Sequence, residues 1–286
     1  MNIYVSTAAF VNSSLEQIID IAEKNSLKIE FSSNLPHHPD SYSLVRAAKI
    51  DRITHNYFPA PKNPYVLNLA SLDIEIRQQS INHCIKALEF AREISAPFYA
   101  AHAGYCLDPN PDDLGKKLGE GMGESRNRYW DVFLESVETI EKKAKEVGVL
   151  FLIENNVLTV ENFISYEKVN PLLCCDPSEI KELFSQVQSN YLGLLLDTAH
   201  LKVSSNTLGF DLLGGVQSLS SFIKAIHHSD NDGESDTNRP IDNEYWFQKL
   251  MPVFKELPHV LEVRYQNLTA IKEQEILLTK FAKKPL

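Results

Sequence analysis

Eight short apolar segments recur along the chain, and in most intervals a stretch with helical periodicity separates one from the next. The segments are rich in β-branched and aromatic residues and end in polar residues, which is typical of strands in a parallel sheet. The expected strands are Asn2–Ser6, Leu27–Ser32, Asp51–Phe58, Pro97–Gly104, Val149–Asn156, Tyr191–His200, Ile223–Asp230 and His259–Tyr265. Strands that alternate with helices predict an α/β fold built from βαβ units. A doubly wound open sheet shows the same alternation, but the count of eight favours a parallel (β/α)8 barrel.

The intervening segments place apolar residues three and four positions apart, as amphipathic helices do. The expected helices are Ser14–Asn25, Asp73–Ser95, Ser125–Val147, Pro177–Gln188, Asp242–Leu257 and Leu268–Lys283, with a weaker pattern in Ser41–Lys49 and Gly209–Ser221. Neither a change in composition nor a linker divides the 286 residues. Barrels of this class run to roughly 250 residues, so we expect a single domain over residues 1–286.

One segment interrupts the alternation. Residues 105–124 (YCLDPNPDDLGKKLGEGMGE) form a long connection after the fourth expected strand. Long loops in compact domains are usually functional, so we interpret this one as a lid. Its glycines do not match either phosphate-binding pattern, and Glu120 and Glu124 would repel a phosphate.

Charge and cysteine content exclude several classes of protein. The chain has 28 Lys and Arg against 38 Asp and Glu, a formal net charge of −10. Binders of nucleic acid or of anionic membranes usually carry a basic surplus, so we expect neither partner. The four cysteines form no C-x-x-C pair, and no stretch resembles a signal peptide or a membrane span. We expect a soluble, cytoplasmic protein with reduced thiols.

Ligand-type side chains gather at the carboxyl ends of the expected strands, where barrels carry their active sites. They are His55, His102, Glu154, Asp197 with His200, His227 with Asp230, and Glu262. Buried carboxylates need partners, and converging carboxylates and imidazoles would find one in a divalent cation. His228 points away from His227 because neighbouring residues of a strand face opposite sides.

Three motifs carry a resemblance to a known family. The runs L-L-L-D197-T-A-H200, I-H227-H-S-D230-N-D-G233 and L-E262-V-R resemble the xylose-isomerase-like TIM-barrel superfamily. That group includes sugar and sugar phosphate isomerases and epimerases as well as the endonuclease IV repair enzymes. The resemblance implies one divalent cation (Mn²⁺, Mg²⁺, Co²⁺ or Zn²⁺) bound by Glu154, Asp197, His227 and Glu262.

The resemblance also implies roles in catalysis. Glu154 and Glu262 would flank a small carbohydrate, one removing a proton beside a carbonyl and the other returning one, while the cation stabilises the enediolate. Residues expected to contact the substrate are His55, His102, His200, Asp230 and Arg264. A keto or aldo sugar, a sugar phosphate or an inosose all fit, and such barrels are often homo-oligomers.

Two other enzyme classes stay open. The same barrel could support a metal-dependent lyase, such as a dehydratase of a cyclic polyol or of a dehydroshikimate-type acid. The second class is an apurinic-site endonuclease with three zinc ions and nine ligands, of which this chain matches eight: His55, His102, Glu154, Asp197, His200, His227, Asp236 and Glu262. Asn238 replaces the ninth, a histidine, which disfavours the third metal, although Asp236 and a second metal position remain candidates.

Overall fold

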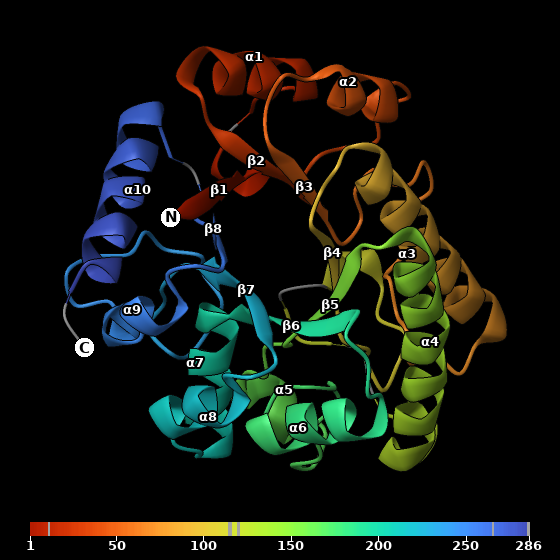
Figure 1. Cartoon of the computed structure of the whole chain (residues 1–286). Coiled ribbons are helices and arrows are strands. Elements are labelled where there is room, and N and C mark those ends of the chain that lie inside the picture. Colours follow the sequence, from red (N-terminus) through yellow and green to blue (C-terminus); the bar gives the residue numbers. More distant parts are fainter. Residues whose placement is uncertain (11, 114–115, 119–120, 265, 285–286) are drawn as a thin grey trace.

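Eight parallel strands close into a barrel in the computed structural model, which describes all residues except 11, 114–115, 119–120, 265 and 285–286. Each strand pairs with the next along the chain, and the last pairs with the first (Figure 1). The strands are β1 (Asn2–Ser6), β2 (Lys28–Phe31), β3 (Arg52–His55), β4 (Phe98–His102), β5 (Leu150–Glu154), β6 (Leu192–Asp197), β7 (Ile223–His228) and β8 (Pro258–Leu261). The expected (β/α)8 barrel is confirmed.

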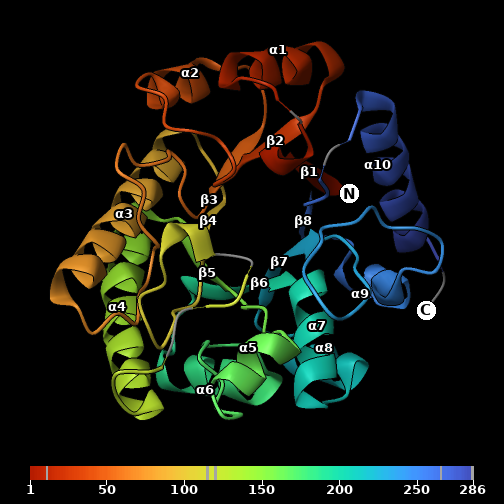
Figure 2. The ribbon, with the colours of Figure 1, turned by 180° about the vertical axis from the view of Figure 1, so that it is seen from behind.

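Helices surround the barrel in both views (Figures 1 and 2). They are α1 (Leu15–Asn25), α2 (Ser41–Ala47), α3 (Ile74–Glu93), α4 (Arg126–Val147), α5 (Val160–Ser165), α6 (Pro177–Gln186), α7 (Thr198–Leu208), α8 (Leu212–Leu219), α9 (Met251–Phe254) and α10 (Leu268–Ala282). The expected start of α1 is a capping box: the Ser14 hydroxyl accepts a hydrogen bond from the backbone N–H of Gln17, and the Gln17 side chain accepts one from the backbone N–H of Ser14. Across the described residues, none of these helices has the length and apolar character to cross a membrane.

The structure corrects one expected helix and the ends of several expected strands, among them Asp51–Phe58, which ends at His55, and His259–Tyr265, which ends at Leu261. The single helix expected over Asp242–Leu257 is wrong, because this segment forms a 3₁₀ helix, η3 (Trp246–Lys249), followed by the four-residue α9. Pro252 has no N–H to donate to a preceding turn, so a continuous helix cannot pass through it. The expected strand Tyr191–His200 is too long, because Asp197 ends β6 and caps α7, accepting a bond from His200 N–H at 2.7 Å. Neither α7 nor the short α5 was expected.

The segment interpreted as a lid packs against the chain that follows β5. Tyr105 forms an isolated bridge with Leu172, and Leu118 N–H donates to the Asn162 side-chain oxygen at 3.0 Å. Leu118 also belongs to a small apolar cluster with Leu158. The segment contains a short 3₁₀ helix, η2 (Pro111–Asp113), while residues 114–115 and 119–120 lie outside the described residues. The lid stays a prediction.

Candidate metal centre

Four side chains from successive strands meet at the carboxyl end of the barrel. Glu154 and Asp197 are the last residues of β5 and β6, His227 lies in β7, and Glu262 directly follows β8. Each offers one ligand atom, and these four atoms all lie within 4.8 Å of one another. The strand register makes Asp197 the direct neighbour of His227, so the barrel itself aligns part of the set. The four residues expected to bind the cation therefore come together.

Glu154 lies at the centre of a wider cluster. Its Oε2 is 2.7 Å from His55 Nε2 and 3.4 Å from His102 Nδ1. Its Oε1 is 3.4 Å from His227 Nδ1 and 3.6 Å from His200 Nδ1. His55, His102 and Glu154 form a second group that could hold a metal, and it shares Glu154 with the first. One carboxylate thus connects two candidate cation positions.

Several ligand atoms in this cluster lack a hydrogen bond. Glu154 Oε1, Asp197 Oδ2 and His102 Nδ1 are buried and make none with the described residues. Leaving such atoms unpaired costs free energy, which a cation would recover. Three carboxylates and one imidazole form a ligand set that suits a moderately hard divalent cation. The residues present therefore fit a resident metal.

The acidic groups have strongly perturbed pKa values. Burial would raise the pKa of Glu154, but His102, His55 and His227 outweigh it and hold the pKa well below its usual range. Burial likewise opposes the effect of His227 on Glu262, whose pKa falls to about 2. Asp197 behaves differently, because burial and the nearby Glu154 and Glu262 carboxylates raise its pKa to about 8 despite His200. A divalent cation would favour the ionised form of all three.

The histidines differ according to their neighbours. Burial lowers the pKa of every one, yet carboxylates reverse this for His227, flanked by Glu30 and Glu262, and for His200, flanked by Asp197 and Asp236. Both pKa values rise well above normal. For His102, burial prevails over the attraction of Glu154 and lowers the pKa to about 4. His102 is therefore neutral at pH 7, the form in which histidine coordinates a metal.

Glu30 is a member of the cluster that sequence reasoning missed. It lies in β2, is fully buried, and its Oε2 is 2.9 Å from His227 Nε2. Together with His55 and His227 it forms a third group of possible ligands. The available signal was a single acidic residue inside the expected strand Leu27–Ser32. It lies two positions before the end of that strand, and only strand ends were searched for ligands.

Three other predicted residues lie at the edge of the cluster or outside it. Asp236 Oδ2 is 3.4 Å from His200 Nε2, so it adjoins the cluster. Asp230 instead accepts a bond from Lys202 Nζ at 2.7 Å. Arg264 is exposed, and its backbone N–H donates to the Asn238 carbonyl. The three ligand groups found among the described residues include none of these side chains.

The accessible edge of the cluster is narrow. The side chains of His102, Asp236 and Glu262 are 23%, 19% and 16% exposed, whereas Glu154 and His227 are completely buried. A small molecule that enters from the barrel mouth would therefore meet His102, Asp236 and Glu262 first.

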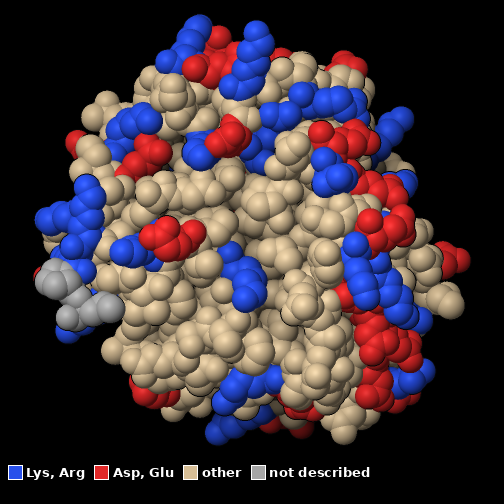
Figure 3. All heavy atoms as spheres, in the orientation of Figure 1, with Lys and Arg blue, Asp and Glu red and all other residues tan. Residues whose placement is uncertain are grey.

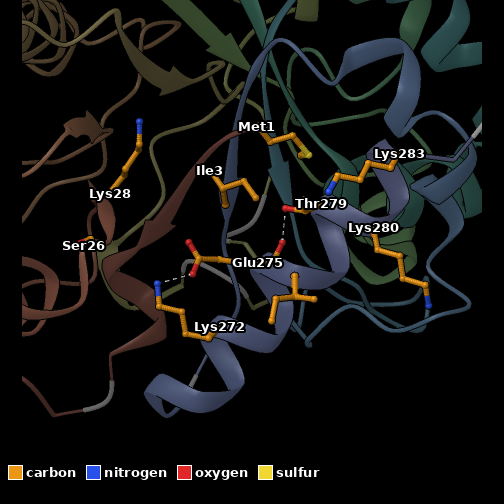
Figure 4. Close-up of a pocket in the computed structure, with 10 residues that line it drawn as sticks. Met1, Ile3, Ser26, Lys28, Lys272, Glu275, Thr279, Lys280 and Lys283 are labelled. Carbon is orange, nitrogen blue, oxygen red and sulfur yellow. Dashed lines mark hydrogen bonds and ion pairs between the residues drawn. The ribbon is translucent and has the colours of Figure 1, made fainter.

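A cleft of about 700 Å³ lies elsewhere, between α10 and the start of β1 (Figure 4). Four lysines line it, but Lys28 pairs with Asp51 at 2.6 Å and Lys272 pairs with Glu275 at 3.0 Å. Figure 4 shows Lys28 and Lys280 extending in opposite directions. The ammonium groups do not converge, so this cleft offers no focused anion site.

Curated relatives match most of the chain at low identity. An uncharacterized protein of Methanocaldococcus jannaschii is 23% identical over 215 residues, which cover 74% of this chain and 65% of that protein. The chain thus spans just under two thirds of this relative's length. A probable endonuclease 4 of Aquifex aeolicus is 24% identical over 225 residues, covering 71% of this chain and 70% of the relative.

A similar solved structure supports the same fold. The crystal structure of a D-tagatose 3-epimerase-like protein superposes with a TM-score of 0.75 at 16% identity, covering 98% of this chain and 97% of that chain. The sequence profile of one family, described as xylose isomerase-like TIM barrel, matches residues 29–277. The resemblance expected from the motifs is confirmed, and the chain belongs to the xylose isomerase-like TIM barrel family.

Proposed function

We propose that the protein is a divalent-metal-dependent isomerase or epimerase of a small carbohydrate. One observation carries the proposal: ligand atoms of Glu154, Asp197, His227 and Glu262 lie within 4.8 Å of one another, and Glu154 Oε1 and Asp197 Oδ2 are buried without a hydrogen bond to any described residue. The epimerase-like protein that shares this fold motivates the choice of an isomerase or epimerase among the enzymes that such a site could serve.

The four side chains would hold one cation of the Mn²⁺, Mg²⁺, Co²⁺ or Zn²⁺ class. When bound, the cation supplies Lewis-acid chemistry, which stabilises negative charge that develops on substrate oxygens. Asp197 would serve as a ligand only, because it lies at the completely buried base of the cluster. His227 would contribute Nδ1, the ring nitrogen that faces Glu262, Glu154 and Asp197.

Glu262 is the better placed of the two proposed proton carriers. Its side chain is partly exposed at the mouth, where a carboxylate can accept a proton from carbon beside a carbonyl. Glu154, on β5, would return a proton to the other face of the planar intermediate. Because its own pKa is low, Glu154 would first take that proton from His55, whose Nε2 lies 2.7 Å away and whose pKa is raised by Glu154 despite burial. Transfer to the opposite face inverts the carbon, and transfer to the neighbouring carbon interconverts ketose and aldose.

His102 at the mouth would bind the substrate in its neutral form. His102 can donate or accept one hydrogen bond in its neutral form, and its exposed edge faces the opening. His200 and His55 lie deeper and reach Glu154 directly. We also propose that His55, Asp230 and Arg264 contact the substrate.

Proton exchange tests this function directly. We expect the Mn²⁺-loaded protein to incorporate deuterium from D₂O into at least one member of a panel of ketoses, aldoses, inososes and their phosphates. A chelator should stop the exchange, and Glu262→Gln should slow it by about 10²–10⁴-fold. The matched control is Glu234→Gln, which neutralises an exposed glutamate outside the cluster.

Two outcomes would change the assignment. If no compound in the panel exchanges a proton in metal-loaded protein, the proposed function fails. If exchange is accompanied by a new product that absorbs in the ultraviolet, an enone has formed and the protein is a lyase.

An apurinic-site endonuclease is the second candidate. Similarity to probable endonuclease 4 proteins favours it, as do two ligand groups that share Glu154. Against it, Asn238 occupies the position of the ninth ligand. In addition, neither His200 nor Asp236 belongs to any of the groups of possible metal ligands found among the described residues. Figure 3 shows acidic and basic side chains interspersed on one face of the molecule, so that face has no continuous basic surface. Chelator-sensitive nicking of an abasic duplex, with two or more bound zinc ions, would establish this function instead.

A further inference from the structure

We propose that Glu30 is the positioning residue that aims His227 at the cation. This inference rests on the metal site proposed above and assigns a role to a residue that no sequence motif identified. Glu30 and His227 come from β2 and β7, which are separated by β1 and β8 in the barrel. Their side chains meet inside the barrel, where both are completely buried.

The two ring nitrogens of His227 face different partners. Nε2 lies 2.9 Å from Glu30 Oε2. Nδ1 lies 2.9 Å from Glu262 Oε2, 3.4 Å from Glu154 Oε1 and 3.7 Å from Asp197 Oδ2. The ring therefore points Nδ1 into the four-residue group and Nε2 away from it.

Glu30 decides which nitrogen carries the hydrogen in neutral His227. An ionised carboxylate only accepts hydrogen bonds, so the contact requires a proton on Nε2. The lone pair of a neutral ring is then on Nδ1, directed at the other carboxylates. Metal-binding histidines commonly donate their second N–H to such a partner, which fixes both tautomer and ring orientation.

A competing role for Glu30 is direct coordination of a cation. It offers a ligand atom that lies within 4.8 Å of ligand atoms of His55 and His227. The two roles make different demands on the side chain. Orientation requires an acceptor at the position of Oε2, which the carbonyl oxygen of glutamine supplies. Coordination of a divalent cation requires the carboxylate, which glutamine replaces poorly.

Metal titration of substituted proteins separates the roles. We expect Glu30→Leu to weaken Mn²⁺ binding by about 10- to 100-fold, as loss of such partners does. Glu30→Gln should recover at least about 3-fold of that loss by restoring the acceptor. The control is Glu138→Gln on the exposed face of α4, which should bind Mn²⁺ like the wild type. Circular dichroism of the metal-free proteins checks folding, and Glu30→Asp replaces Glu30→Leu if the leucine variant does not fold.

Each result decides something. Unchanged Mn²⁺ affinity in Glu30→Leu overturns the inference, and equal losses in both variants assign Glu30 as a ligand instead. A wild-type protein that binds none of the four cations overturns both the inference and the proposed function. Normal Mn²⁺ binding without any proton exchange overturns the proposed function alone.

Discussion

Two adjacent histidines of β7, His227 and His228, show how position decides chemistry in this barrel. Both are completely buried, but they face opposite sides of the strand. His227 faces the interior, where Glu30 and Glu262 raise its pKa well above normal despite burial. His228 faces outward, where burial and the neighbouring His259 lower its pKa well below normal.

The outer environment is a chain of neutral hydrogen bonds. His259 Nε2 must donate, because its partner 3.2 Å away is the Phe254 carbonyl. His259 Nδ1 then accepts from His228 Nε2 at 2.8 Å, and His228 Nδ1 accepts from the Tyr245 hydroxyl at 2.9 Å. These outer histidines find a partner for each ring nitrogen, whereas Glu154 Oε1 and Asp197 Oδ2 on the inner face make no hydrogen bond with the residues that the structure describes. The inner face is therefore the one whose side chains fit the proposed cation.

The largest effect expected on the inner face comes from Glu154→Gln. The substitution neutralises the carboxylate that connects both candidate cation positions, so we expect bound metal to fall and proton exchange to drop by at least about 10³-fold. Metal content must be measured beside activity, because Glu154 is proposed both as ligand and as proton carrier. A variant that keeps full metal and full activity would remove Glu154 from the mechanism.

The next contrast compares His227→Asn with His228→Asn. Losing an inner ligand should weaken Mn²⁺ binding by about 100-fold or more, whereas the outer substitution should change it by less than about 3-fold. His228→Asn should instead lower the free energy of unfolding by about 1–3 kcal/mol, because Tyr245 and His259 lose a buried partner. Mn²⁺ titration and urea denaturation measure the two quantities. Similar metal affinities in both variants would contradict the distinction between the faces.

The sequence predicted the inner face better than the outer one. Glu154, Asp197 and Glu262 could be located because each follows an apolar run, and the ends of parallel strands meet at one edge. Glu30 was missed because it lies within its strand, and strands buried on both faces give no alternation that shows which residues point inward. The hydrogen-bond chain was also out of reach, since Tyr245 lies within the segment Asp242–Leu257 that was expected to be one helix, whereas in the structure it directly precedes the short helix η3.

Asp230 shows a second reason why the sequence could not predict the whole site. Its position after β7 resembles that of the ligands, yet its backbone pairs with Arg239 in an isolated bridge and its carboxylate accepts from Lys202. Both partners depend on how a loop folds back. Strand-end position therefore predicts proximity to the barrel mouth, but it does not determine which neighbour a side chain selects.

We expect His259, on the outer face, to make the free energy of unfolding depend on pH. The pKa of His259 is lowered to about 4 by burial, despite its bond to Phe254, against about 6.5 in an unfolded chain. The unfolded state therefore binds more protons, and the stabilising contribution present above pH 6.5 is lost as the pH falls toward 4. We expect the metal-free wild type to lose about 3 kcal/mol more over this interval than His259→Gln, which does not titrate. Urea denaturation at several pH values gives both curves, and parallel curves would show that His259 does not act this way.

The smallest expected effect tests whether the two faces are coupled. Tyr245 donates to His228, and its hydroxyl lies 2.6 Å from Thr198 Oγ1, which is 3.0 Å from the carbonyl of His227. Tyr245→Phe should cost about 1 kcal/mol in unfolding free energy, because His228 loses its donor. In the wild type the single hydroxyl hydrogen of Thr198 goes to Tyr245, because the Tyr245 hydrogen goes to His228. In Tyr245→Phe it is free to bond to the His227 carbonyl 3.0 Å away, so Mn²⁺ affinity should stay within about 2-fold of the wild type. Tyr42→Phe, at a partly exposed ring on α2, is the matched control. A tenfold loss of Mn²⁺ affinity in Tyr245→Phe alone would mean that the outer chain helps to hold β7 in place, so that the neutral face positions the charged one.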